Sequence, residues 1–171
     1  MPTVIENAFL SYGKEDAPVK VEVFLNLACP YCATFFQAAD DTLTPYIDNG
    51  QVQYVIKHYD KPREMLLYGT LANTFLDYKD PQRVYELMKD LFAKQSRWSE
   101  SDSHSIKKML VEDYGLQEEP DNIELSLKIT AEAIKRQVKM VPTVFINGKE
   151  FQFPVELDAS GLKQEVEQAL A

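Results

Sequence analysis

Residues 19–32 read VKVEVFLNLACPYC, and this stretch decides the fold class. Its first seven residues, Val19–Leu25, alternate apolar and polar side chains before becoming wholly apolar, which predicts a β-strand. Cys29-Pro30-Tyr31-Cys32 follows, and proline suits the first turn of a helix, where its missing N–H had no partner to lose. The stretch therefore predicts a strand that leads into a helix, with Cys29 at the helix N-terminus and Cys32 one turn further on.

The sequence after the second cysteine completes this unit. Apolar residues recur at helical spacing from Phe35 to Ile47, and Asn49-Gly50 ends the predicted helix. Residues 51–59 alternate as a second strand. The order strand, helix, strand predicts a β-α-β unit with a parallel crossover.

The rest of the chain is a long helical run followed by a hairpin and a last helix. Residues 62–138 show helical periodicity throughout, and residues 143–146 form a third predicted strand. Asn147-Gly148 is a strong hairpin signal that pairs this strand with residues 149–153, and Asp158 is placed to cap the terminal helix. The fold class is therefore α/β. The last helix of the run is expected to carry Ile123, Leu127, Ala131, Ile134 and Val138 as its recurring apolar residues.

Length and charge exclude several classes of protein. The 171 residues suffice for one domain with an insertion, and the net charge of −9 disfavours nucleic acid and anionic membranes as partners. No apolar run reaches the roughly 18 residues that a transmembrane helix needs. Met1 to Leu10 lack the pattern of a secretory signal peptide. We therefore expect a cytoplasmic protein if the chain is complete, and an extracytoplasmic one if a signal has been removed.

Cys29 and Cys32 carry the predicted chemistry. A helix N-terminus offers unpaired N–H groups that favour a thiolate, so we expect Cys29 to be an exposed nucleophile of low pKa. Cys32 lies on the same face within disulfide reach and would resolve the mixed disulfide. His58 and His104 do not complete a zinc spacing with the pair, so neither a metal site nor an organic cofactor is expected. His58 is interpreted as a surface histidine at a strand end, with a role as general base as the alternative.

A second conspicuous segment precedes the third strand. Val141-Pro142-Thr143 places a proline just before a strand, and two interpretations remain open. Most such prolines belong to ordinary loops. The alternative is a cis bond that holds the preceding backbone towards the cysteines, although only about 5–6% of X-Pro bonds are cis.

Three segments together resemble the DsbA-like family of thioredoxin-fold oxidoreductases. They are CPYC at 29–32, LFAKQSRW at 91–98 and VPTVFINGK at 141–149. The resemblance implies a thioredoxin fold with an inserted all-helical domain, dividing the chain into a thioredoxin-like part, 1–61 and 139–171, and an inserted part, 62–138.

The same resemblance implies a function and a site. It implies thiol–disulfide exchange through Cys29 and Cys32, and a cis Val141–Pro142 bond. Pro30, Tyr31, Val141 and Pro142 would contact the substrate, with the residue before the cis-proline holding an extended chain by strand-like hydrogen bonds. The implied partners are proteins with thiols or disulfides and a redox-recycling partner.

The DsbA-like family often has a buried carboxylate six residues before the nucleophile, and this sequence has Val23 there. Because successive side chains of a strand point to opposite faces, Glu22 is predicted to point away from Cys32.

Two other functions remain as alternatives to thiol–disulfide exchange. One is a glutathione-dependent transferase or isomerase on the same scaffold, and the other is a non-enzymatic adaptor.

Overall fold

A computed structural model describes residues 8–151 and 159–171 and has a five-stranded sheet at its centre. The strand order is β1-β3-β2-β4-β5, with β2 and β3 parallel and the other pairs antiparallel. The strands are β1 (Leu10–Tyr12), β2 (Val19–Leu25), β3 (Val52–His58), β4 (Thr143–Ile146) and β5 (Lys149–Phe151). The sequence did not predict β1, because three residues are too few to show a period of two.

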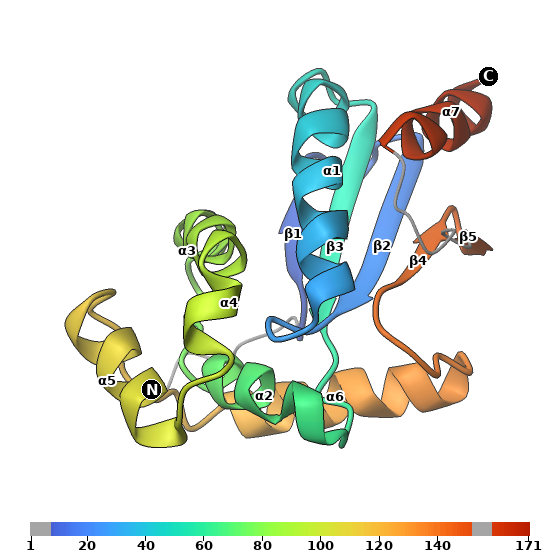
Figure 1. Ribbon diagram of the computed structural model, residues 1–171. Helices are drawn as coiled ribbons and strands as arrows, with labels where there is room; N and C mark the ends of the chain where they lie inside the picture. The colour runs from blue at the N-terminus through green and yellow to red at the C-terminus, as the bar shows by residue number, and fades with distance from the viewer. Residues whose placement is uncertain (1–7, 152–158) are drawn as a thin grey trace, which may run out of the picture.

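The helices surround the sheet unevenly. In Figure 1, α1 and α7 lie over one face, α3 to α5 gather beyond one edge, and α6 runs across the end where α1 begins. The helices are α1 (Pro30–Asp48), the 3-10 helix η1 (Glu64–Leu66), α2 (Leu67–Asn73), α3 (Pro81–Ala93), α4 (Gln95–Trp98), α5 (Ser103–Glu112), α6 (Asn122–Lys135) and α7 (Ala159–Leu170). The predicted α/β thioredoxin fold with helices inserted between β3 and β4 is confirmed. The domain boundaries at residues 61–62 and 138–139 stay a prediction.

Two predictions about the C-terminal part lie outside the described residues. They are the helix cap at Asp158 and the end of the hairpin strand at residues 152–153. The other strand and helix predictions there are confirmed by β4, β5 and α7. None of the described helices is long and apolar enough to cross a membrane.

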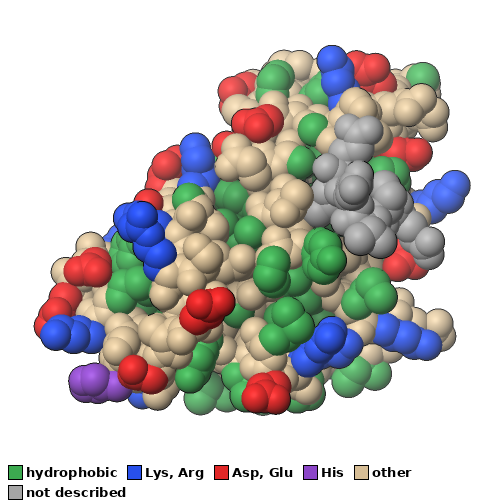
Figure 2. All heavy atoms as spheres, viewed as in Figure 1, with side chains coloured by type: hydrophobic (Ala, Val, Ile, Leu, Met, Phe, Trp, Pro, Cys, Tyr) green, Lys and Arg blue, Asp and Glu red, His purple; other side chains and the backbone are tan. Residues whose placement is uncertain are grey.

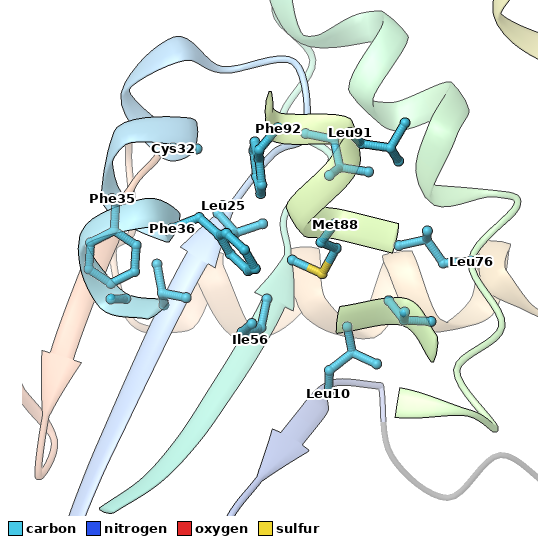
Figure 3. Close-up of a cluster of buried hydrophobic side chains, with 14 of the residues drawn as sticks. Leu10, Leu25, Cys32, Phe35, Phe36, Ile56, Leu76, Met88, Leu91 and Phe92 are labelled. Carbon is cyan, nitrogen blue, oxygen red and sulfur yellow. The ribbon is translucent and has the colours of Figure 1, made fainter. Parts of the chain in front are cut away.

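The main hydrophobic core joins α1 to both the sheet and α3. Figure 3 shows Phe36 of α1 and Phe92 of α3 in one cluster with Leu25 and Ile56 of the sheet. The Phe36 and Phe92 rings lie 5.1 Å apart, centroid to centroid. Cys32 is fully buried at the edge of this cluster. The core therefore couples the active-site helix to the inserted helices.

Of the apolar residues expected in the last inserted helix, Val138 is buried just after α6, but most of the others are not. Ile123, Leu127 and Ile134 are exposed, at 63%, 58% and 68%. Both apolar sets of α6 recur at helical spacing, so periodicity alone does not choose between them. Packing against Phe24 and Phe145 on the second face of the sheet decides the orientation of the helix. The residues of α6 that are buried are Asn122, Leu125, Ile129 and Ala133.

Candidate active site

Cys29 caps the helix that carries the cysteine pair. It has extended backbone angles (φ −83°, ψ 120°), and its Sγ accepts a hydrogen bond from the N–H of Cys32 at 3.4 Å. Its carbonyl accepts the first helical hydrogen bond, from the N–H of Ala33 at 3.1 Å. Pro30 occupies the first helical position. The predicted placement of Cys29 at a helix N-terminus is confirmed, and both thiols are free.

The expected exposure of Cys29 is wrong. The residue is 4% exposed and Cys32 is 0% exposed. The segment before β4 covers Cys29, because the carbonyl oxygen of Val141 lies 3.6 Å from Sγ and accepts its hydrogen bond. Cys29 is the one member of the pair that keeps contact with solvent.

The two thiols have very different acidities. Hydrogen bonding with the Cys32 side chain, assisted by the N–H groups of Cys32 and Tyr31 and by the charge of Arg63, outweighs burial and lowers the pKa of Cys29 to about 7. Burial, followed by the effect of Cys29, raises the pKa of Cys32 well above its ordinary value. Near neutral pH, Cys29 is therefore far more readily ionised than Cys32.

The Val141–Pro142 segment lies against the cysteine pair. The peptide bond between these residues is cis, as the resemblance implies. The contact between Val141 and Cys29 joins residues 112 positions apart in the sequence. Tyr31 is 54% exposed beside them. Figure 2 shows hydrophobic side chains gathered around the first turn of α1 and below it, with most charged side chains nearer the margin of this face.

β2 separates Glu22 from the cysteines, as predicted. Val23 belongs to the core that contains Cys32. Phe24 belongs to the second core on the other face, and the cations that bind Glu22 lie over the Phe24 ring. Cys32 instead accepts a hydrogen bond from the backbone N–H of Asn26 at 3.5 Å.

Glu22 belongs to a partly buried ion cluster, which we define as Glu22, Lys57, Glu132 and Arg136. Lys57 Nζ lies 2.6 Å from Glu22 and 2.7 Å from Glu132, and Arg136 Nη1 lies 2.9 Å from Glu22. Burial opposes ionisation of Glu22, but hydrogen bonds from Arg136 and Lys57 outweigh it and lower the pKa of Glu22 to about 2. The ion cluster ties α6 to β2 and β3. The ion cluster could not be predicted from the sequence, because its members come from separate elements.

His58 is not a surface residue. It is 2% exposed, and burial lowers its pKa to about 3. The side chain lies edge-on to Tyr78, with ring centroids 6.3 Å apart. The prediction failed because Tyr78, in the inserted segment between α2 and α3, packs against the end of β3. His58 is therefore neutral at physiological pH. His104 is exposed in α5, away from the contacts described above.

The inserted helices hold the loop before Cys29 from two sides. The Asn26 side-chain amide donates to the carbonyl of Leu66 at 3.3 Å. Gly69 of α2 sits so close that a Cβ there would lie 1.8 Å from Asn26 Oδ1. On the other side, Gln95 Nε2 donates to the carbonyls of Leu27 and Cys29. Gln95 was not among the predicted site residues, although it lies in the LFAKQSRW segment that carries the resemblance.

Within residues 8–151 and 159–171, no group of three or more His, Cys, Asp or Glu side chains is arranged to hold a metal ion. The reactive groups of the site are the two sulfurs and the polar groups around them.

A sheet of this topology, with a dithiol at the start of its first helix and a cis-proline opposite, defines a thioredoxin-fold dithiol protein. The chain belongs to the family described as Thioredoxin, whose model matches residues 7–163. The resemblance to DsbA-like proteins is consistent with the names of its relatives.

Two curated relatives are named for disulfide chemistry. The chain is 46% identical over 88 residues to the thiol:disulfide interchange protein DsbG of Escherichia coli K12, a match that covers 47% of this chain and 30% of DsbG. It is 27% identical over 154 residues to the probable disulfide bond formation protein D of Bacillus cereus ATCC 14579, covering 81% of this chain and 69% of that protein. The match to DsbG thus spans less than a third of its length.

A solved structure of a conserved protein of unknown function from Enterococcus faecalis V583 is also similar. It superposes with a TM-score of 0.83 at 28% identity, covering 94% of this chain and 88% of the other.

Proposed function

We propose that this protein is a thiol–disulfide oxidoreductase that acts on proteins through Cys29 and Cys32. The observation that carries the proposal is the pairing of a thiol of pKa about 7 at a helix N-terminus with a buried thiol of raised pKa one turn away. Such a pair has one sulfur suited to attack and one protected until the first has reacted. The names of the two curated relatives support the same chemistry.

The exchange proceeds in two balanced steps. The Cys29 thiolate attacks one sulfur of a substrate disulfide, so that a Cys29–substrate bond forms and the other substrate sulfur leaves as a thiolate. Cys32 then loses its proton and attacks Cys29, which releases the second substrate sulfur. The substrate gains two electrons and the pair becomes a disulfide. In reverse, the same steps oxidise a substrate dithiol.

Substrate binding is proposed at the surface around Cys29. Tyr31 is exposed and offers an aromatic contact, and Pro30 is exposed beside it. The Val141 carbonyl, which now accepts from Cys29, would accept from the backbone of an extended substrate, with Pro142 alongside. A protein substrate is favoured over a small one because these contacts recognise backbone and apolar surface.

The direction of exchange depends on the compartment and the recycling partner. A reducing cytosol would keep the pair as a dithiol, and an oxidising compartment would keep it as a disulfide. Cytoplasmic and extracytoplasmic locations thus lead to different predictions: a reductase in the first case and an oxidase or isomerase in the second. The redox state of the pair in the native cell, trapped by rapid alkylation, distinguishes them.

The test compares the wild type with Cys29→Ser and Cys32→Ser. The wild type should catalyse reduction of insulin by dithiothreitol and oxidation of a reduced two-cysteine peptide by oxidised glutathione, and both variants should lose this turnover. Conjugation of glutathione to an electrophile that survives in Cys32→Ser, without disulfide turnover in the wild type, would instead favour a glutathione-dependent transferase. Absence of both activities in the folded wild type would favour an adaptor.

A further inference from the structure

The side chain of Gln95 connects the inserted helices to the residue that carries the reactive sulfur. Gln95 begins α4 and is 7% exposed. Its Nε2 donates hydrogen bonds to the carbonyl of Leu27 at 2.7 Å and to the carbonyl of Cys29 at 2.9 Å. A primary amide carries two N–H groups on one nitrogen, so a single side chain satisfies both carbonyls.

Gln95 is itself held in place. Trp98 is 3% exposed, and its indole N–H donates to the carbonyl of Leu91 at 2.8 Å, across the junction of α3 and α4. Leu91 and Phe92 of α3 belong to the core that contains Cys32. The residues next to Gln95 in the chain are therefore fixed by packing in the core, which restricts where its side-chain amide can lie.

The hydrogen bond to the Cys29 carbonyl bears on the Cys29 sulfur. That carbonyl also accepts from Ala33, so its direction sets the start of α1. The Sγ of the same residue accepts from the N–H of Cys32 at 3.4 Å. Turning the peptide group of Cys29 would move Sγ relative to the N–H groups that stabilise its thiolate. Two donors at the neighbouring carbonyls also reduce the negative potential near the sulfur.

We propose that Gln95 is a positioning residue for Cys29, through which the inserted helices set the reactivity of the thiol. This role rests on the proposed function, because it requires Cys29 to be the nucleophile. Gly69 supports it from the other side of the loop, because a Cβ there would lie 2.7 Å from the N of Ala28 and displace the same segment.

The first test replaces Gln95 by methionine, which has similar length but no donor. In Gln95→Met, the pKa of Cys29 should rise by about half a unit to one unit, so that its alkylation by iodoacetamide at pH 6 slows about three- to tenfold. The matched control is Gln37→Met, because Gln37 is exposed on α1 and donates to Asp41 instead. It should leave the pKa and the rate unchanged. A Cys29 pKa in Gln95→Met equal to that of the wild type would overturn the proposal.

A second measurement needs no substitution at Gln95, so it holds even if Gln95→Met does not fold. In the reduced wild-type protein, the NMR signals of the Gln95 side-chain amide should shift with pH and follow the titration of Cys29, and the shift should vanish in Cys29→Ser. A Gln95 amide signal that is insensitive to this titration would refute the link. Both readouts follow a thiol pKa and not turnover, so they are separable from a failure of the proposed function, which would appear as a wild type without exchange activity.

Discussion

The two faces of β2 differ sharply in the charge they hold. Val23 faces the dry core with Cys32, whereas Glu22, its neighbour in sequence, forms ion pairs with Lys57 and Arg136 on the opposite face. The thiols therefore ionise under the control of hydrogen bonds from the start of α1, without a carboxylate from β2. The ion cluster serves to fasten α6 to the sheet. One strand thus separates reactivity from stability by the alternation of its side chains.

The largest expected effect lies on the cysteine face. Cys29→Ser should lower insulin reduction on the order of a thousandfold or more, because the hydroxyl is not ionised at neutral pH. The free energy of unfolding of the reduced protein should change by about 1 kcal/mol or less, because serine is a good N-cap. Urea unfolding beside the activity assay checks both. Substantial turnover in Cys29→Ser would show that the reactive group does not lie on the cysteine face.

The charged face should show the opposite pattern. Glu22→Gln removes the buried carboxylate that pairs with Lys57 and Arg136. The free energy of unfolding should therefore fall by about 3 kcal/mol. Resolution of mixed disulfides by the folded variant should stay nearly unchanged, because Glu22 points away from Cys32. Urea unfolding and rapid-quench kinetics are the measurements, and Glu124→Gln, at an exposed site on α6, is the control. A severalfold slowing of resolution in Glu22→Gln would show that the register argument is wrong.

The two thiols on the cysteine face should differ in alkylation. The rate for Cys29 should reach half of its maximum near pH 7, the value of its lowered pKa. At that pH, Cys32 should be alkylated at least about fiftyfold more slowly than Cys29, because the pKa of Cys32 is raised well above its ordinary value. Mass spectrometry of peptides after timed quenching measures the two rates separately. Equal rates would contradict the assignment of roles.

Acid unfolding should separate the two faces by pH range. His58 binds a proton in the unfolded chain below pH 6.5 but in the folded protein only near pH 3, so stability falls as the pH drops between these values. Glu22 stabilises the fold above its ordinary pKa of 4.5, and this contribution is lost as the pH falls towards 2.

Of these two groups, only His58 therefore changes the stability between pH 6.5 and 4.5. There, His58→Phe should reduce the slope of stability against pH by about 1 kcal/mol per pH unit, and Glu22→Gln should leave the slope unchanged. Urea unfolding at several pH values measures it. A slope that persists in His58→Phe and disappears in Glu22→Gln would reverse the assignment.

Local patterns predicted the central part of the fold. β2, α1 and β3 follow from alternation, helical spacing and Pro30, and the turn between β4 and β5 follows from Asn147-Gly148. The placement of Cys29 at a helix N-terminus needed no more than this. The cis bond before Pro142 came from the resemblance, since no local pattern distinguishes it from an ordinary loop proline.

What the sequence did not predict depends on contacts between distant segments. The orientation of α6 is decided by packing against Phe24 and Phe145, and the buried His58 lies against Tyr78, 20 positions later in the chain. In the sequence, Gln95 is indistinguishable from an ordinary polar helix residue. Its hydrogen-bond partners lie 66 and 68 positions away. Such long-range pairings leave no periodic signal in the sequence.

If Cys29 attacks and Cys32 resolves, trapping with oxidised glutathione should distinguish the two sulfurs. The reduced wild type, Cys29→Ser and Cys32→Ser are each mixed with oxidised glutathione at pH 7, quenched with acid and weighed by mass spectrometry. We expect an internal disulfide in the wild type, rapid accumulation of a glutathione adduct on Cys29 in Cys32→Ser, and almost no adduct in Cys29→Ser. Rapid adduct formation on Cys32, or a wild type that keeps its adduct without forming the internal disulfide, would contradict it.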